Sequence, residues 1–88
     1  MVTHTLKTWP KYYNAVASGE KNFEFRKNDR DFKVGDLLLL QEWDPETETY
    51  TGLEIHRKIT YILNGGDAEL NFGIDPAFSI LSIVPLEL

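Results

Sequence analysis

Alternation of apolar and polar residues predicts strands over most of this chain, because successive side chains of a strand point to opposite faces. Residues 2–7 and 22–27 alternate strictly, and 50–63 is a long strand pattern, richest in Ile, Thr and Tyr. The apolar run at 37–43 is typical of a strand that is buried on both faces. A last strand is expected at 78–84, which reads FSILSIV before a proline that cannot donate to a ladder.

Helical spacing of apolar residues occurs in one segment and predicts one short helix at about 9–18. Thr8 stands where an N-cap residue would, and Pro10 falls in the first turn, where a missing N–H matters little. Gly19 is a plausible end, since glycine tolerates the left-handed conformation that closes many helices.

Turn-forming residues separate these elements. The breaks are expected at the polar cluster 28–31, the Val-Gly-Asp at 34–36, the acidic hairpin loop 44–48, the glycines at 64–66 and the loop 67–77 with Gly73 and Pro76. Gly52 is a candidate bulge in the long strand. Five short strands and one helix predict a single α+β domain over residues 1–88, mostly β, and a partly closed barrel is favoured because closure hides strand edges.

Composition narrows the class of protein without naming a function. Hydrophobic residues make up 42% of the 88 positions and charged residues 26%, which is ordinary for a small globular domain. The absence of cysteine excludes disulfides, thiolate metal sites and a cysteine nucleophile, and it fits a reducing compartment. No apolar run reads as a signal peptide or reaches membrane-spanning length, so a cytoplasmic protein without a membrane contact is expected.

Charge is distributed unevenly along the chain. The formal net charge of −5 argues against non-specific coating of nucleic acid, because phosphate binding needs cations. Residues 1–33, however, hold seven bases against four acids, a net +3, whereas the remainder holds two bases against ten acids, a net −8. A locally basic side can steer a polyanion toward it, although charge alone favours a solvated surface of paired side chains.

The candidate site lies in the strand at 22–27. Phe23 and Phe25 alternate there with Glu24 and Arg26, and Lys21 lies just upstream. Alternation predicts that the two phenyl rings enter the core while the charged side chains share the other face, where they could work on a ligand. On a solvated face they would form an ion-pair ladder, which contributes about 0–1 kcal/mol. In a cleft, the carboxylate could accept from a base edge while the cations bind phosphate or polarise a carbonyl.

Other aromatic and titratable residues give weaker signals. The phenylalanines are expected in the core, whereas Trp9 and Trp43 stand at element ends beside polar residues, where a ring could stack on a planar base. His4 and His56 lie far apart with no metal-ligand spacing around them, so each is expected to be exposed or structurally bonded. We expect no metal and no cofactor.

With these residues in view, the chain resembles the DUF3850 group of small ASCH-type domains in the PUA-like superfamily. The residues that carry the resemblance, from His4 to Val84, are His4-x-Leu6-Lys7, the block GEKNFEFRKNDR at 19–30, Val34-Gly35-Asp36, Glu42-Trp43, Tyr50-Thr51-Gly52 and FSILSI at 78–83. The resemblance implies a PUA-like pseudo-barrel with a helix at one side, and a cleft lined by the Lys, Glu and Arg of that block. It also implies a bacterial or phage-like source.

ASCH relatives are generally proposed to bind RNA. One branch that is similar in fold acts as an amidohydrolase on acetylated cytidine, with a Lys followed three residues later by a Thr, and a Glu further along. Here Lys21 matches the Lys, but Glu24 stands at the Thr position. The hydroxyl nucleophile is therefore absent, while a general-base mechanism that uses Glu24 stays open.

The leading hypothesis is a monomeric binding module for RNA, another nucleic acid or a modified base. Lys21, Arg26 and Arg30 would hold phosphate or base, and Glu24 would accept from a base edge. The stacking residue would be Trp9 or Trp43. Whether Asn28-Asp29-Arg30 belongs to this site or is only the turn that positions it stays open, with the turn favoured because Asn and Asp tolerate left-handed backbone.

Two alternatives accompany this hypothesis. The first is a small hydrolase, amidohydrolase-like or nuclease-like, acting on a nucleoside or nucleic acid, with Glu24 as general base, Lys21 as proton donor and Arg26 as anion holder. The second is a protein–protein adaptor in which the ion-pair strand is merely structural. A closed pocket with Glu24 touching Lys21 would favour an enzyme, and an open basic groove would favour a binder.

Overall fold

Five strands and one short helix are present in the computed structural model, which describes residues 1–67 and 74–86. Their bounds are β1 (Thr3–Thr8), α1 (Pro10–Ala17), β2 (Phe23–Lys27), β3 (Leu37–Asp44), β4 (Thr49–Asn64) and β5 (Phe78–Pro85). Each predicted element is confirmed in type and order. The predicted loop 67–77 lies partly outside the described residues, including its Gly73.

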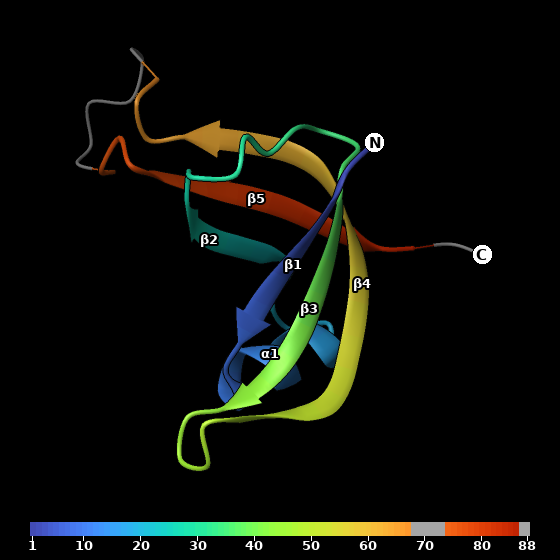
Figure 1. Ribbon diagram of the computed structural model, residues 1–88. Coiled ribbons are helices and arrows are strands. Elements are labelled where there is room, and N and C mark those ends of the chain that lie inside the picture. Colours follow the sequence, from blue (N-terminus) through green and yellow to red (C-terminus); the bar gives the residue numbers. More distant parts are fainter. Residues whose placement is uncertain (68–73, 87–88) are drawn as a thin grey trace.

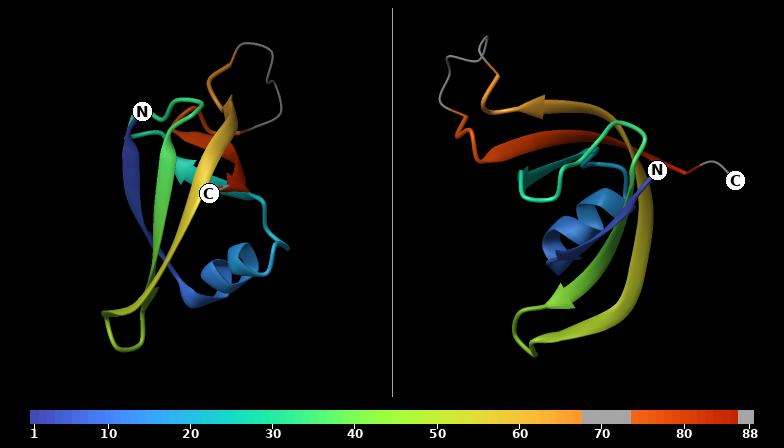
Figure 2. Two further views of the ribbon diagram at one scale, coloured as in Figure 1. Left: turned by 90° about the vertical axis from the view of Figure 1, so that its right-hand side faces the viewer. Right: turned by 45° about the horizontal axis from the view of Figure 1, so that its top comes forward.

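The strands form one curled sheet in the order β1-β3-β4-β5-β2. β1 runs parallel to β3, and the other neighbours are antiparallel. The sheet bends so strongly that its two edge strands, β1 and β2, come close together, while α1 lies at one end of the concave side (Figures 1 and 2). This is the predicted α+β, mostly β architecture, a pseudo-barrel closed on all but one side. No helix within 1–67 or 74–86 has the length and apolar character needed to cross a membrane.

β4 contains two irregularities in its pairing, one with β3 and one with β5. Its pairing with β3 shifts between Gln41 and Trp43, where Gly52 has a φ of +94°, so the predicted bulge is confirmed. Its pairing with β5 shifts again between Ile59 and Tyr61. Because bulges bend a strand and increase its twist, these two sites account for the curl that brings β2 back toward β1.

The core occupies the concave side. It consists of eight buried apolar residues from the helix, four strands and the loop before β3: Leu6, Val16, Phe32, Leu38, Leu40, Ile59, Leu81 and Ile83. Leu38 and Leu40 are fully buried, whereas Leu37 and Leu39 are partly exposed. The prediction that this strand is buried on both faces is therefore wrong, because the sheet is a single layer and only its concave side is covered.

The helix starts one residue later than predicted. Trp9 is its N-cap and makes no side-chain cap bond, so the prediction of Thr8 as N-cap is wrong. Thr8 instead ends β1, and its hydroxyl donates to the carbonyl of Leu6 (3.4 Å). Gly19 follows the helix with a φ of +84°, a left-handed conformation that confirms the predicted stop.

The faces of β2 are reversed relative to the prediction. Phe23 and Phe25 are about half exposed, and Glu24 between them is only 2% exposed. Glu24 lies opposite the core residue Leu81 in the ladder with β5, which places the charged face on the concave side. Alternation shows which side chains share a face but not which face is covered, and the curl of the sheet decides the latter.

His4 is structurally bonded and His56 is exposed, as predicted. Asp36, which is buried, accepts from the His4 ring nitrogen (2.9 Å) and from the backbone N–H groups of Val2 (3.2 Å) and Lys33 (3.1 Å). The hydrogen bond from His4, and after it those from the backbone, lower the pKa of the Asp36 carboxyl below its usual range. This cluster fixes the start of β1 to the turn that precedes β3.

Candidate functional site

A pocket of about 670 Å³ opens where β1, α1 and β2 meet. The described residues that line it all fall within a single stretch of the chain, from the end of β1 to β2. They are Lys7, Thr8, Trp9, Tyr12, Lys21, Phe23, Glu24, Phe25 and Arg26.

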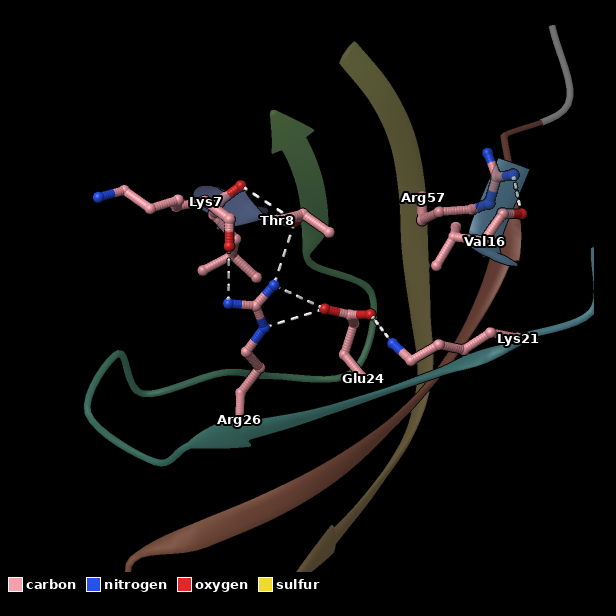
Figure 3. Close-up of polar contacts among 8 residues, drawn as sticks. Lys7, Thr8, Val16, Lys21, Glu24, Arg26 and Arg57 are labelled. Atoms are coloured by element: carbon pink, nitrogen blue, oxygen red, sulfur yellow. Dashed lines mark hydrogen bonds and ion pairs between the residues drawn. The ribbon is translucent and has the colours of Figure 1, made fainter. Parts of the chain in front are cut away.

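A carboxylate held between two cations lies against this pocket (Figure 3). Glu24 Oε1 accepts from Arg26 Nε (2.9 Å) and Nη2 (2.8 Å), and Glu24 Oε2 contacts the Lys21 ammonium. The Lys21 and Arg26 side chains are 17% and 25% exposed, against 2% for Glu24. The carboxylate is therefore shielded from water, while its partners reach the open space of the pocket.

The local backbone explains why these side chains meet. Residues 24 and 26 share one face of β2 because side chains alternate along a strand. Lys21 comes from the turn after α1, and its N–H donates to the carbonyl of Ala15 (2.9 Å), which fixes that turn against the helix. The left-handed Gly19 allows the chain to reverse there, so that Lys21 approaches Glu24.

The two edge strands, β1 and β2, face each other across a gap, and we call this gap the seam. Arginine side chains bridge it. Arg26 Nη1 donates to the carbonyl of Lys7 (3.2 Å), and its Nη2 also reaches the hydroxyl of Thr8 (3.2 Å). Further along, Arg30 Nη1 donates to the carbonyl of Thr5 (2.9 Å). The two edge strands are thus joined by guanidinium groups and not by a backbone ladder, which leaves room for the pocket at the seam.

Four exposed aromatic side chains belong to the pocket lining, and we call them the aromatic rim. They are Trp9, Tyr12, Phe23 and Phe25, each between 47% and 53% exposed. The Lys21 ammonium lies 5.0 Å from the ring centre of Phe23 and 5.9 Å from that of Tyr12. The aromatic rim therefore surrounds the charged groups of Lys21, Glu24 and Arg26.

Four of the six predicted site residues meet in this pocket, namely Lys21, Glu24, Arg26 and Trp9. Trp43 does not line it. The ring of Trp43 is partly buried and lies under the Lys7 ammonium, 4.1 Å from the ring centre. Arg30 lines a smaller neighbouring pocket instead.

The segment Asn28-Asp29-Arg30 lies outside the lining of the candidate pocket. The N–H of Asn28 donates to the carbonyl of Ala77 (2.7 Å), which ties the turn to the start of β5. Asp29 and Arg30 line the smaller pocket.

Sequence reasoning missed five lining residues. Phe23 and Phe25 were assigned to the core, and Lys7, Thr8 and Tyr12 were given no role in the site. Lys7 was among the residues that carry the family resemblance, and a signal for Tyr12 was its helical spacing from Trp9, three residues apart, which puts both on one side of α1.

The pocket is cationic although the whole chain is acidic. Lys21 and Arg26 face it, with Glu24 as the one acid among the described lining residues, whereas Lys7 lies at its edge with its carbonyl bound to Arg26 and its ammonium over Trp43. Such a lining attracts anions locally. A carboxylate offers about four acceptor positions, and the described contacts of Glu24 use three of them. The fourth position has no partner among the described residues.

Metal chemistry has no candidate ligand set in the described residues. Within 1–67 and 74–86, no three or more His, Asp or Glu side chains lie close enough together to hold a metal ion.

Comparison with known proteins gives one named relative and one family. Over 64 residues, the chain is 38% identical to the "Uncharacterized 12.9 kDa protein in GpA 3′ region" of Escherichia phage P2. The match covers 73% of this chain and 57% of the phage protein, so the chain spans somewhat more than half of that relative. The model of a family described as "Domain of unknown function (DUF3850)" matches residues 3–83, which include the whole pocket. The chain therefore belongs to the DUF3850 family, as its motifs predicted.

Proposed function

We propose that this protein is a binding module that takes a base of single-stranded RNA into the pocket at the seam. The observation that carries the proposal is the aromatic rim around a shielded carboxylate with two cationic partners. Aromatic side chains stack on bases whatever the nucleotide sequence, and carboxylates accept hydrogen bonds from the N–H groups of base edges. The resemblance to ASCH domains favours RNA among the nucleic acids.

Stability alone does not explain this arrangement. A buried ion network is often no more stabilising than well-packed apolar residues of the same volume, yet β2 turns Glu24 inward and leaves two phenylalanines half exposed. Reversals of this kind are expected at functional sites. The adaptor hypothesis treats the ion-pair strand as merely structural, and it gives no reason for a buried Glu24 beside a pocket.

The pocket residues have different roles in the proposed complex. The rings of Trp9 and Tyr12 stack on the base. The remaining acceptor position of Glu24 takes an N–H group of the base edge. Lys7 takes no direct part, because its ammonium lies over Trp43.

Fluorescence anisotropy with short single-stranded RNA tests this function. Trp9→Ala is expected to weaken binding by about 1–3 kcal/mol, the usual contribution of one base stacked on an aromatic ring. Tyr50→Ala is the matched control, because Tyr50 is 54% exposed and lies in β4 away from the pocket. Equal affinity of both variants and the wild type would exclude base stacking at Trp9.

A second candidate function is a hydrolase that acts on a nucleoside or nucleic acid. The direct contact between Lys21 and Glu24 inside a pocket favours it, since these two groups could take a proton from water and give one to a leaving group. The occupied acceptor positions of Glu24 disfavour it. Incubation with RNA and nucleosides, followed by product analysis, separates the two functions, and turnover that survives in Glu24→Gln would rule out this mechanism.

A further inference from the structure

We propose that the smaller pocket beside the first is a phosphate subsite, so that a nucleotide places its base in the larger pocket and an adjoining phosphate in the smaller one. This inference rests on the proposed function and deepens it. The smaller pocket has a volume of about 190 Å³ and is lined by Leu6, Lys7, Arg26, Lys27, Asp29, Arg30 and Phe32.

The two pockets adjoin. Lys7 and Arg26 line both of them, and these two residues, joined by the hydrogen bond from Arg26 Nη1 to the Lys7 carbonyl, lie between the two spaces. A ligand that fills the first pocket can therefore extend past Arg26 into the second. The ligand would extend along the seam between β1 and β2, because no backbone ladder crosses it in the described structure.

The linings of the two pockets differ in chemistry. Among the described residues, three cationic side chains line the smaller pocket, Arg26, Lys27 and Arg30, against one acid, Asp29; the Lys7 ammonium lies over Trp43 instead. Its apolar residues, Leu6 and Phe32, are 3% and 8% exposed, so neither offers an open ring on which a base could stack. A small cationic pocket without an exposed aromatic face suits a phosphate group better than a base.

Hydrogen-bond donors are available there. Lys27 is exposed, and its ammonium makes no hydrogen bond to any described residue. Arg30 commits one N–H group to the carbonyl of Thr5, and its other guanidinium N–H groups have no partner among the described residues. Arg26, in contrast, uses all three of its nitrogens in contacts within the protein. Lys27 and Arg30 are thus the phosphate-binding residues, and Arg26 is a positioning residue.

The test is the salt dependence of RNA binding. For single strands, each phosphate contact contributes a slope of about −0.7 to the plot of log K against log salt concentration. We expect Lys27→Gln combined with Arg30→Gln to weaken binding about tenfold and to make the slope less steep by about 0.7, as for one lost phosphate contact. Trp9→Ala is expected to weaken binding with an unchanged slope.

Lys58→Gln serves as the matched control, because Lys58 is an exposed strand lysine outside both pockets. Thermal unfolding of each variant separates lost binding from lost folding, and Lys27→Gln alone keeps the test valid if Arg30→Gln unfolds. If the Lys27 and Arg30 variants bind like Lys58→Gln while Trp9→Ala weakens binding, the phosphate subsite is overturned and the base pocket stands.

Inorganic phosphate tests the subsite without RNA. In an NMR titration, we expect shifts at the backbone amides of residues 27–30 in the wild type and none there in the double variant. If RNA fails to bind the wild type, the base pocket falls. Phosphate shifts at 27–30 would then still support the anion subsite, and their absence would overturn it as well.

Discussion

At the scale of single residues, the unusual feature is a carboxylate that is almost inaccessible to water but faces a pocket. Glu24 is 2% exposed, and both of its oxygens have cationic partners. Charge-assisted hydrogen bonds of this kind are short and strong, but they offset a large loss of hydration. The net contribution of the network is therefore small, and the removal of one member is costly because it leaves the others unpaired.

Glu24→Gln is expected to destabilise the protein by about 1–3 kcal/mol. The amide oxygen can still accept from Arg26, but the amide nitrogen becomes a donor that faces the Lys21 ammonium. Urea unfolding measures the change in free energy. Glu20→Gln is the control, since Glu20 is exposed and its side chain forms no hydrogen bond to a described residue. A loss no larger than that of the control would show that the network contributes nothing to stability.

Asp36 predicts how stability depends on pH. Its folded-state pKa is lowered, chiefly by the hydrogen bond from His4, relative to about 3.9 in an unfolded chain. The unfolded chain therefore binds a proton first as pH falls, and the stabilisation present above about pH 4 is lost as pH drops through the folded-state value.

Urea unfolding at about pH 7 and about pH 3 measures this loss for the wild type and for Asp36→Asn. We expect Asp36→Asn to be less stable at neutral pH by about 1–3 kcal/mol, because buried donors lose a charged acceptor. Its stability should also fall less between the two pH values than that of the wild type. Parallel losses in the two proteins would place the acid sensitivity at other carboxyl groups.

At the scale of secondary-structure elements, the turn between α1 and β2 depends on the backbone conformation of Gly19. Its φ of +84° lies in the left-handed region, and a Cβ at this position would meet no atom of a described residue within 4 Å. Backbone strain alone would therefore act in Gly19→Ala, which we expect to lower stability by roughly 1–2 kcal/mol.

Gly66→Ala is the matched control for that measurement. Gly66 has no positive φ, and among the described residues its nearest Cβ contact would be an ordinary 3.6 Å. We expect its unfolding free energy to stay within about 0.5 kcal/mol of the wild type. If Gly19→Ala were equally mild, the turn after α1 would have to adopt another conformation without cost.

The elements themselves were largely readable from sequence because their patterns are local. Alternation and turn residues placed β1, β2 and β5 within one or two residues of their observed bounds. The pattern of β2 also grouped Glu24 with Arg26 correctly, yet it assigned the pair to the wrong side of the sheet. Inside and outside are set by the curl of the sheet, which depends on pairings between residues far apart in the chain.

At the scale of the whole molecule, the seam was not predictable. Arg26 lies 19 residues from Lys7, and Arg30 lies 25 residues from Thr5, and no local pattern signals that their side chains meet backbone carbonyls. The sequence therefore predicted only part of the set of residues that line the site. Trp43 was included because it ends an element, whereas the closure of the barrel selects Tyr12 and Phe23.

The same closure makes a prediction about local stability. Arg26→Lys keeps a positive charge next to Glu24 but removes the planar fork that reaches the Lys7 carbonyl and the Thr8 hydroxyl. We expect the free energy of unfolding to fall by about 1–3 kcal/mol, as for the loss of two hydrogen bonds. Hydrogen exchange should show a larger loss of protection in β1, at the amides that pair with β3, than in the central β4–β5 ladder.

The β4–β5 amides serve as the internal control in this experiment, because they lie on the far side of the sheet from the seam. Global unfolding exposes every strand alike, so it reduces protection by the same amount everywhere. An excess loss confined to β1 means that the edge strand opens alone once the guanidinium is gone. A uniform loss would instead mean that Arg26 stabilises the fold as a whole, and β1 would then be held at the seam by other contacts.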